Sequence, residues 1–178
     1  MKRITIPAVA LAAGLAAGTA AASDGTITFQ GVITAATCTV AVNGGTATAS
    51  ITLPTVSSSI LAANTESAGD SAFILELSDC DLDTLTDVMP YFEVGPNVDL
   101  ATGHLNNTGT ATNVQVQLFY GQDASKVVRI GSLEQLADAN ANWLADDGTL
   151  TFGARYYAAG AVVPGSVVTS VTYSLVYR

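Results

Sequence analysis

The sequence predicts an all-β domain, and the arrangement of its residues supports this in two ways. Several runs alternate apolar and polar residues with the period of two that places one set of side chains on one face of a strand. Turn residues separate these runs, as in Asn43-Gly44-Gly45 and Gly95-Pro96-Asn97. Short strands divided by such turns are typical of a β-sandwich or a β-barrel.

The first residues are typical of a secretory signal peptide. Lys2 and Arg3 precede an apolar run at residues 4–17, and small residues lead up to Ala22. The run is too short and too rich in Ala and Gly for a transmembrane helix, so we expect no direct membrane insertion. We predict that residues 1–22 are removed, with cleavage one or two residues earlier as the alternative.

The remaining chain is strongly acidic. Loss of the two positive charges of Lys2 and Arg3 changes the formal net charge from −9 to −11. A chain of this charge repels phosphate backbones and anionic membrane surfaces, so we expect no nucleic-acid partner. Solubility outside the cell is the simplest reason for the acidity.

Cys38 and Cys80 are the two cysteines. An even number in an exported chain favours a disulfide. Closing this 42-residue separation would remove about 4 kcal/mol of unfolded-chain entropy. A reactive or metal-binding role is the alternative, although no histidine or further cysteine lies near the pair.

The alternation predicts strands in six places, in chain order: 26–34, 47–53, 72–78, 114–120, 149–157 and 167–177. One segment, Ser132 to Leu144, instead spaces Leu133, Leu136 and Trp143 as a helix would, which predicts a short helix or ordered loop. No linker or internal repeat interrupts these runs, so we expect one domain after the signal peptide.

The sequence offers little catalytic chemistry. His104 is the only histidine, and it cannot build a multi-histidine metal site. A catalytic triad would need Ser and Asp partners, but no Gly-x-Ser-x-Gly motif is present, so we expect a surface or strand-edge histidine. Asp79, Asp81 and Asp83 alternate as in a calcium loop but lack its glycine, which favours a solvated loop. We therefore expect no enzyme, no metal and no cofactor.

Both ends of the mature chain look like strands without a neighbour. Near the start, Gly25, Ile27, Phe29 and Gly31 share one face, with two large apolar side chains between two bare positions. Such a strand could fold onto its own domain or add to the sheet edge of another chain. The last strand places Val171, Tyr173, Leu175 and Tyr177 on one face, and an exposed edge of this kind needs cover.

The chain resembles the pilin subunits of chaperone–usher fimbriae of the type 1 major-subunit kind. The resemblance covers essentially the whole mature chain and is carried by these stretches: Gly25 to Ile33 with Thr37-Cys38, Phe73 to Cys80, Leu105 to Thr108 leading into Val114 to Leu118, and the tail with Gly165 and the penultimate Tyr177.

The resemblance implies an incomplete immunoglobulin-like β-sandwich that lacks its last strand and carries an N-terminal donor-strand extension. Residues 23–34 would be the extension and residues 35–178 the pilin domain. Gly25, Ile27, Phe29 and Gly31 match the donor strand. The family disulfide matches Cys38 and Cys80. The tail that the chaperone recognises and that borders the groove matches Gly165, Val171, Tyr173, Leu175 and Tyr177.

The function that follows from the resemblance is a structural subunit of a surface fimbria that polymerises by donor-strand exchange and supports cell adhesion. Its expected partners are a periplasmic chaperone, an outer-membrane usher and neighbouring pilin subunits in a head-to-tail homopolymer. Export through the periplasm to the cell surface is expected. The alternative is a minor tip or adaptor pilin, or a small single-domain adhesin that binds a surface receptor. The Ser132 to Leu144 segment has no counterpart in the resemblance and could decorate the filament surface.

Overall fold

A computed structural model describes residues 27–121, 123–137, 143–144 and 147–178 of the chain. The chain divides into two parts, residues 1–33 and 34–178, which we describe separately. In the first part, described residues 27–33 form no strand or helix, and their large apolar side chains are exposed. Of the strand predicted over 26–34, the described residues 27–34 form none, because no strand in the described part of the chain supplies ladder hydrogen bonds to them.

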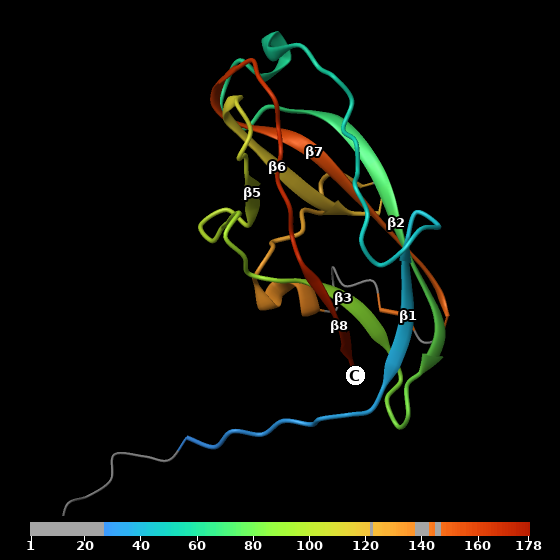
Figure 1. Ribbon diagram of the computed structural model, residues 1–178. Helices are drawn as coiled ribbons and strands as arrows, with labels where there is room; N and C mark the ends of the chain where they lie inside the picture. The colour runs from blue at the N-terminus through green and yellow to red at the C-terminus, as the bar shows by residue number, and fades with distance from the viewer. Residues whose placement is uncertain (1–26, 122, 138–142, 145–146) are drawn as a thin grey trace, which may run out of the picture. The chain divides into compact units, whose positions relative to one another are not determined.

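The second part is built from strands that lie in two antiparallel sheets (Figure 1). The larger sheet has the order β1-β2-β7-β6-β5-β4, and the smaller sheet pairs β3 with β8. Their bounds are β1 Thr37–Val42, β2 Ser67–Asp81, β3 Val88–Phe92, β4 Val98–Asp99, β5 His104–Asn106, β6 Thr112–Tyr120, β7 Gly148–Val163 and β8 Tyr173–Tyr177. Two 3-10 helices, η1 Ser58–Leu61 and η2 Leu133–Leu136, lie in the connections.

The core lies between the two sheets and is centred on Phe152 of β7. Its ring meets Phe73 of β2 at 5.7 Å and Tyr120 of β6 at 5.8 Å between centroids. From the smaller sheet, Phe92 of β3 meets it edge-on at 5.2 Å. Contacts of this geometry between aromatic rings contribute beyond the area they bury, so Phe152 joins the two layers.

The predicted strands at 72–78, 114–120 and 149–157 are confirmed within β2, β6 and β7. The apolar faces expected there are buried: Phe73, Leu75 and Leu77 on β2, and Val114, Val116, Leu118 and Tyr120 on β6. The strand expected at 47–53 is not formed, and the one expected at 167–177 is strand only over Tyr173–Tyr177. The sequence pattern missed β1, β3, β4 and β5, which are short and alternate over only a few residues.

The segment after Ser132 contains the short helix that the spacing predicted, but its buried face differs. Leu133 is 76% exposed, whereas Gln135 is buried. The helix lies beside β3 (Figure 1). The expectation that this segment decorates the surface is therefore wrong for Gln135, which contacts the backbone of β3.

Candidate interaction groove between β1 and β8

Two strands have an open edge where they face each other. In the part of the chain that the structure describes, β1 pairs with β2 and β8 pairs with β3, and no strand lies between β1 and β8. Arg178 and Asp87 exchange both backbone hydrogen bonds, each at 2.9 Å. Alternate residues of an antiparallel strand bond opposite neighbours, so the backbone groups of Tyr173, Leu175 and Tyr177 point away from β3 and into the gap.

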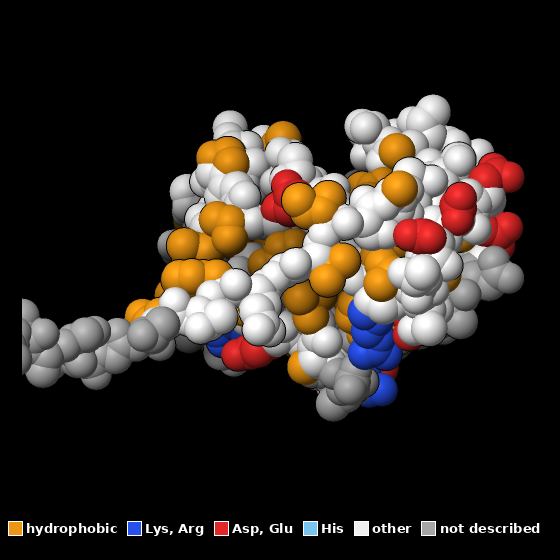
Figure 2. Space-filling model, turned by 90° about the horizontal axis from the view of Figure 1, so that it is seen from below, with side chains coloured by type: hydrophobic (Ala, Val, Ile, Leu, Met, Phe, Trp, Pro, Cys, Tyr) orange, Lys and Arg blue, Asp and Glu red, His pale blue; other side chains and the backbone are white. Residues whose placement is uncertain are grey.

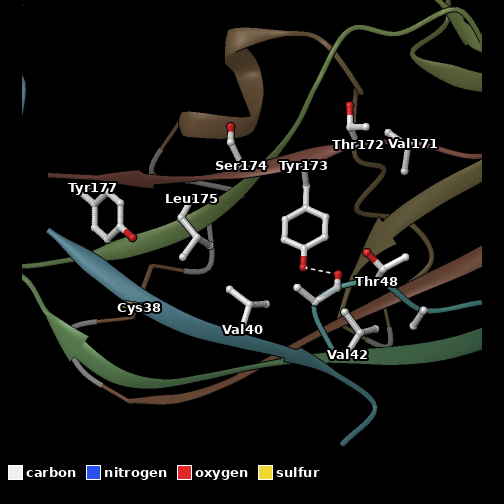
Figure 3. A pocket seen from close by; sticks show the side chains of 12 residues that line it. Cys38, Val40, Val42, Thr48, Val171, Thr172, Tyr173, Ser174, Leu175 and Tyr177 are labelled. Carbon is white, nitrogen blue, oxygen red and sulfur yellow. Dashed lines mark hydrogen bonds between the residues drawn. The ribbon is translucent and has the colours of Figure 1, made fainter. Parts of the chain in front are cut away.

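A groove of about 670 Å³ occupies this gap (Figure 3). Tyr173 and Leu175 point into it from β8, and Val40 and Val42 point towards them from β1. Its lining residues are Cys38, Val40, Val42, Ala47, Thr48, Ala49, Val171, Thr172, Tyr173, Ser174, Leu175 and Tyr177. The lining side chains of β1 and β8 also pack against the core, so the groove opens onto the hydrophobic interior.

Two tyrosine hydroxyls reach across the groove. The Tyr173 hydroxyl donates to the carbonyl oxygen of Ala47 at 2.7 Å (Figure 3). Burial raises the pKa of Tyr177, and a hydrogen bond with the backbone of Cys38 opposes that rise. Burial also raises the pKa of Tyr173. Both phenols therefore stay protonated at neutral pH and can donate hydrogen bonds within a mostly apolar groove.

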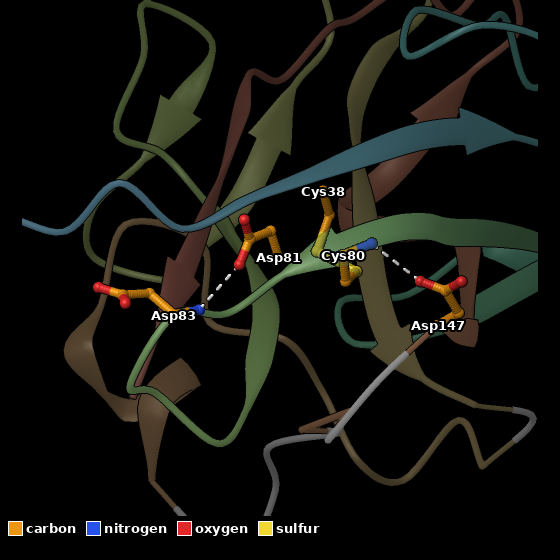
Figure 4. Close-up of a disulfide and its surroundings, with 5 residues drawn as sticks. All are labelled: Cys38, Cys80, Asp81, Asp83 and Asp147. Atoms are coloured by element: carbon orange, nitrogen blue, oxygen red, sulfur yellow. Dashed lines mark hydrogen bonds between the residues drawn. A yellow bond between two sulfur atoms is a disulfide. The ribbon is translucent and has the colours of Figure 1, made fainter.

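The predicted disulfide is present, and it fixes one wall of the groove. Cys38 of β1 is bonded to Cys80 of β2, with 4.1 Å between their Cα atoms (Figure 4). The backbone N–H of Cys80 donates to Asp147 at 3.0 Å. Among the described strands β1 pairs only with β2, so this covalent link to β2 holds β1 in place while its other edge stays open.

Gly165 lies apart from this groove, at a second cavity of about 390 Å³. A Cβ atom on Gly165 would collide with the backbone of Thr110 and Ala111. The next residue is held on the same loop, since Ala111 N–H donates to Ser166 O at 3.0 Å. Gly165 therefore allows the tail to pass close to the 107–111 loop before it reaches β8.

The structure brings together four of the five predicted tail residues, since Val171, Tyr173, Leu175 and Tyr177 all line the groove. It also shows the β1 side of the groove, which the sequence reasoning missed. The alternation of Cys38, Val40 and Val42 is the signal that could have found it.

The predicted donor residues lie in the other part of the chain. Ile27 is 81% exposed and Phe29 is 89% exposed. A Cβ atom on Gly31 would meet only open space. Gly25 and the predicted signal peptide lie outside the described residues.

His104 is buried, so the expected surface location is wrong, although it does lie on a strand. Its Nδ1 lies 3.3 Å from Gln115 Oε1, and its Nε2 lies 2.8 Å from Gln117 Nε2. With the proton on Nδ1, the histidine donates to Gln115 and accepts from Gln117. Gln115 donates onward to Asp99, and Arg155 donates to Gln117, so one directed chain of hydrogen bonds satisfies these side chains.

No group of three or more potential metal ligands occurs among the residues that the structure describes. In the same residues, no helix has the length and hydropathy needed to cross a membrane.

The face shown in Figure 2 exposes hydrophobic side chains at several places across its middle, and acidic side chains gather on its right margin.

Comparisons with known proteins agree on one family. The model of the type-1 fimbrial protein A family (FimA) matches residues 53–178. The chain is 40% identical over 164 residues to the major fimbrial subunit SMF-1 of Stenotrophomonas maltophilia. The aligned region covers 88% of this chain and 94% of SMF-1. It is 35% identical over 168 residues to the F17 fimbrial protein of Escherichia coli, covering 88% and 89%.

Solved structures show the same fold. The rod subunit PapA of the P pilus aligns with a TM-score of 0.57 and 22% identity, over 86% of this chain and all of PapA (100%). A subunit of a chaperone–usher pilus whose structure concerns rod uncoiling aligns with a TM-score of 0.59 and 20% identity, over 88% and 96%. The fold expected from the resemblance, an incomplete immunoglobulin-like sandwich, is thereby confirmed.

Proposed function

Since the chain belongs to the type-1 fimbrial protein family and is a structural subunit of a surface fimbria, we propose that it polymerises by strand exchange. Residues 23–34 of one copy insert between β1 and β8 of the next. The copy that donates at its N-terminal end accepts at its groove. Such a head-to-tail contact does not close on itself, so it builds a filament.

The observation that carries this proposal is the open edge of β8 beside an apolar groove. The outward backbone groups of Tyr173, Leu175 and Tyr177 can form a ladder with an added strand. Ile27 and Phe29 are exposed apolar side chains two residues apart, so they lie on one face of an extended strand. Burying both in the groove would contribute roughly 1.5–3 kcal/mol each.

The strand's bare positions complement this arrangement. Gly25 and Gly31 flank the two large side chains on the same face, where they let the added backbone pass close to a wall. The Cys38–Cys80 link supports the exchange because it keeps β1 in position when the groove is empty.

Other partners follow from the open groove. An exposed strand edge invites aggregation, so a subunit in transit needs a temporary cover. We propose that a periplasmic chaperone supplies a strand to this groove and that an outer-membrane usher exchanges it for the next subunit's extension. The homology to a major fimbrial subunit supports a rod subunit over a tip adhesin.

The test separates donation from acceptance. Deleting residues 23–31 should give a subunit that accepts but does not donate, so it should form no fibres alone and should shorten fibres when coexpressed with the intact chain. Leu175→Asp should give a subunit that donates but does not accept, because a carboxylate would enter the apolar groove. Ser174→Asp is its matched control, since Ser174 borders the groove on the same strand but its exposed side chain points away from the groove (Figure 3).

Together, the deletion variant and Leu175→Asp should form a complex of two subunits and no longer polymer. Electron microscopy and sizing of the purified material measure both outcomes. Fibres formed by the deletion variant alone would refute the donor role of residues 23–31.

A further inference from the structure

The outer edge of β3 is closed, in contrast to the open edge of β8 in the same sheet. Glu93 N–H donates to Thr172 O at 2.9 Å, and Asp87 pairs with Arg178, so the odd-numbered residues of this stretch face β8. Val88, Pro90 and Phe92 therefore turn their backbone groups to the other side. This is the edge at which a further strand could extend the smaller sheet, and its residues are buried beneath other parts of the chain.

At one end of this edge, both backbone groups of Val88 are hydrogen-bonded to Leu144. Its N–H donates to Leu144 O at 2.7 Å, and its carbonyl accepts from Leu144 N–H at 2.9 Å. Pro90, in the middle, has no N–H to offer to a ladder. Proline at an edge is one of the devices by which sheets resist further pairing.

At the other end of this edge, the side chain of Gln135 bonds both backbone groups of Phe92, as a neighbouring strand would. The Gln135 amide accepts from Phe92 N–H at 3.0 Å and donates to Phe92 O at 3.0 Å. Gly131 N–H adds a second bond to Phe92 O at 3.1 Å. A side-chain amide carries one acceptor and two donors, so it can satisfy both backbone groups at once.

Local sequence holds Gln135 in this position. Ser132 caps η2 through its side chain, which accepts from Glu134 N–H at 3.2 Å. The turn directs Gln135 inward, where only 1% of its surface is exposed, and leaves Leu133 in solvent. An apolar side chain here would leave the buried N–H of Phe92 without the Gln135 acceptor, whereas the Phe92 carbonyl would keep its bond from Gly131.

We propose that Gln135 is a specificity-determining residue for strand exchange. It completes the closure of the β3 edge, so that, among the described strands, an incoming strand of a second copy is directed to the groove between β1 and β8. The two-residue β4 offers little ladder at the far end of the larger sheet. The inference rests on the proposed strand exchange, which makes strand addition the event that needs direction.

The test uses whole fibres, in which the grooves are filled by neighbouring subunits. Fibres of the intact chain, of Gln135→Met and of Glu134→Gln are titrated with a fluorescent synthetic peptide of residues 23–34. Methionine keeps the length of the side chain but cannot bond the backbone of Phe92. Glu134 is the matched control because it is exposed and adjacent.

Fibres of the intact chain and of Glu134→Gln should bind peptide only at their ends. Gln135→Met should bind peptide along the whole fibre, with a dissociation constant at these added sites at least about tenfold lower than in intact fibres, the factor expected from releasing a buried hydrogen-bonding group at the edge. Amide hydrogen exchange at Phe92 should accelerate in the same variant. Gln135→Glu keeps an acceptor for Phe92 N–H and should restore much of the protection.

Pro90→Val returns an N–H to the edge while Gln135 stays in place, so it should bind no more peptide than the intact chain. Added binding by Pro90→Val would overturn the inference even where Gln135→Met yields no fibres, because it would show that Pro90 closes the edge in place of Gln135. Faster exchange at Phe92 without added peptide binding would overturn the inference. Fibre assembly by the 23–31 deletion would instead overturn the proposed function, so the two failures can be told apart.

Discussion

Replacing Phe29 with alanine tests whether the exposed N-terminal face is the inserted one. In the described structure Phe29 is 89% exposed, so nearly all of its side chain is available for burial when a neighbour accepts it. Full burial of a phenylalanine contributes up to about 3 kcal/mol, and alanine retains only a small part of this. We therefore expect a loss of about 2 kcal/mol at each subunit contact, or about 30-fold in its dissociation constant.

The assay is the rate at which purified fibres release subunits at a fixed denaturant concentration. Differences in affinity among variants of one interface arise mainly in dissociation, so Phe29→Ala fibres should release subunits about 30-fold faster. Val32→Ala is the matched control, because Val32 is 86% exposed but lies on the opposite face of an extended strand.

Equal release rates for Phe29→Ala and intact fibres would refute the assignment of Phe29 to the groove. A loss at Val32 as large as that at Phe29 would refute the assignment of faces, since it would mean that both faces of the strand are buried. Either result would leave the fold and the family untouched.

Three further predictions concern stability. Replacing Cys38 and Cys80 together with serine should lower the free energy of unfolding by about 4 kcal/mol, as measured with urea, and an unchanged midpoint would contradict a structural role. Gly165→Ala should lower it by about 1–3 kcal/mol, because the added methyl group collides with the backbone of Ala111, whereas Gly95→Ala, in open space, should cost less. Burial lowers the pKa of His104 below its ordinary value of 6.5. The stabilising effect of the neutral histidine is therefore complete above pH 6.5 and is lost as the pH falls from 6.5 toward the lower pKa of the folded state. The melting temperature should fall less between about pH 7 and pH 5 in His104→Gln than in the intact protein, and parallel melting curves for the two proteins would contradict this.

The pattern of the sequence was sufficient where a strand is long and one face is buried. Phe73, Leu75 and Leu77 alternate over enough residues to identify β2 and its core face. It was insufficient for β1, whose six residues follow a stretch that resembled a strand more strongly. The alternating pattern was also misleading at 26–34, because alternation indicates that a segment can form a strand but does not indicate whether its neighbouring strand comes from the same chain or from another.

Buried polar residues show a second limit of prediction from sequence patterns. Gln115 and Gln117 alternate as solvent-facing residues would, yet both are buried in the hydrogen-bond chain through His104. Gln135 lies among leucines with helical spacing, yet it is the buried member of that turn. In each case the partners come from segments distant in sequence, so no local pattern could reveal them.

The β class, the buried faces of the long strands and the pair of cysteines suited to a bridge could all be predicted from the residues, because these features depend on side-chain chemistry and on a period of two along one segment. Which strand edges stay open depends instead on how the chain folds. An edge is open or closed according to hydrogen bonds between distant segments, such as Gln135 with Phe92, and to the missing strand between β1 and β8 in the described part of the chain. The open groove and the closed β3 edge are therefore properties of the fold, and together they direct where another strand can add.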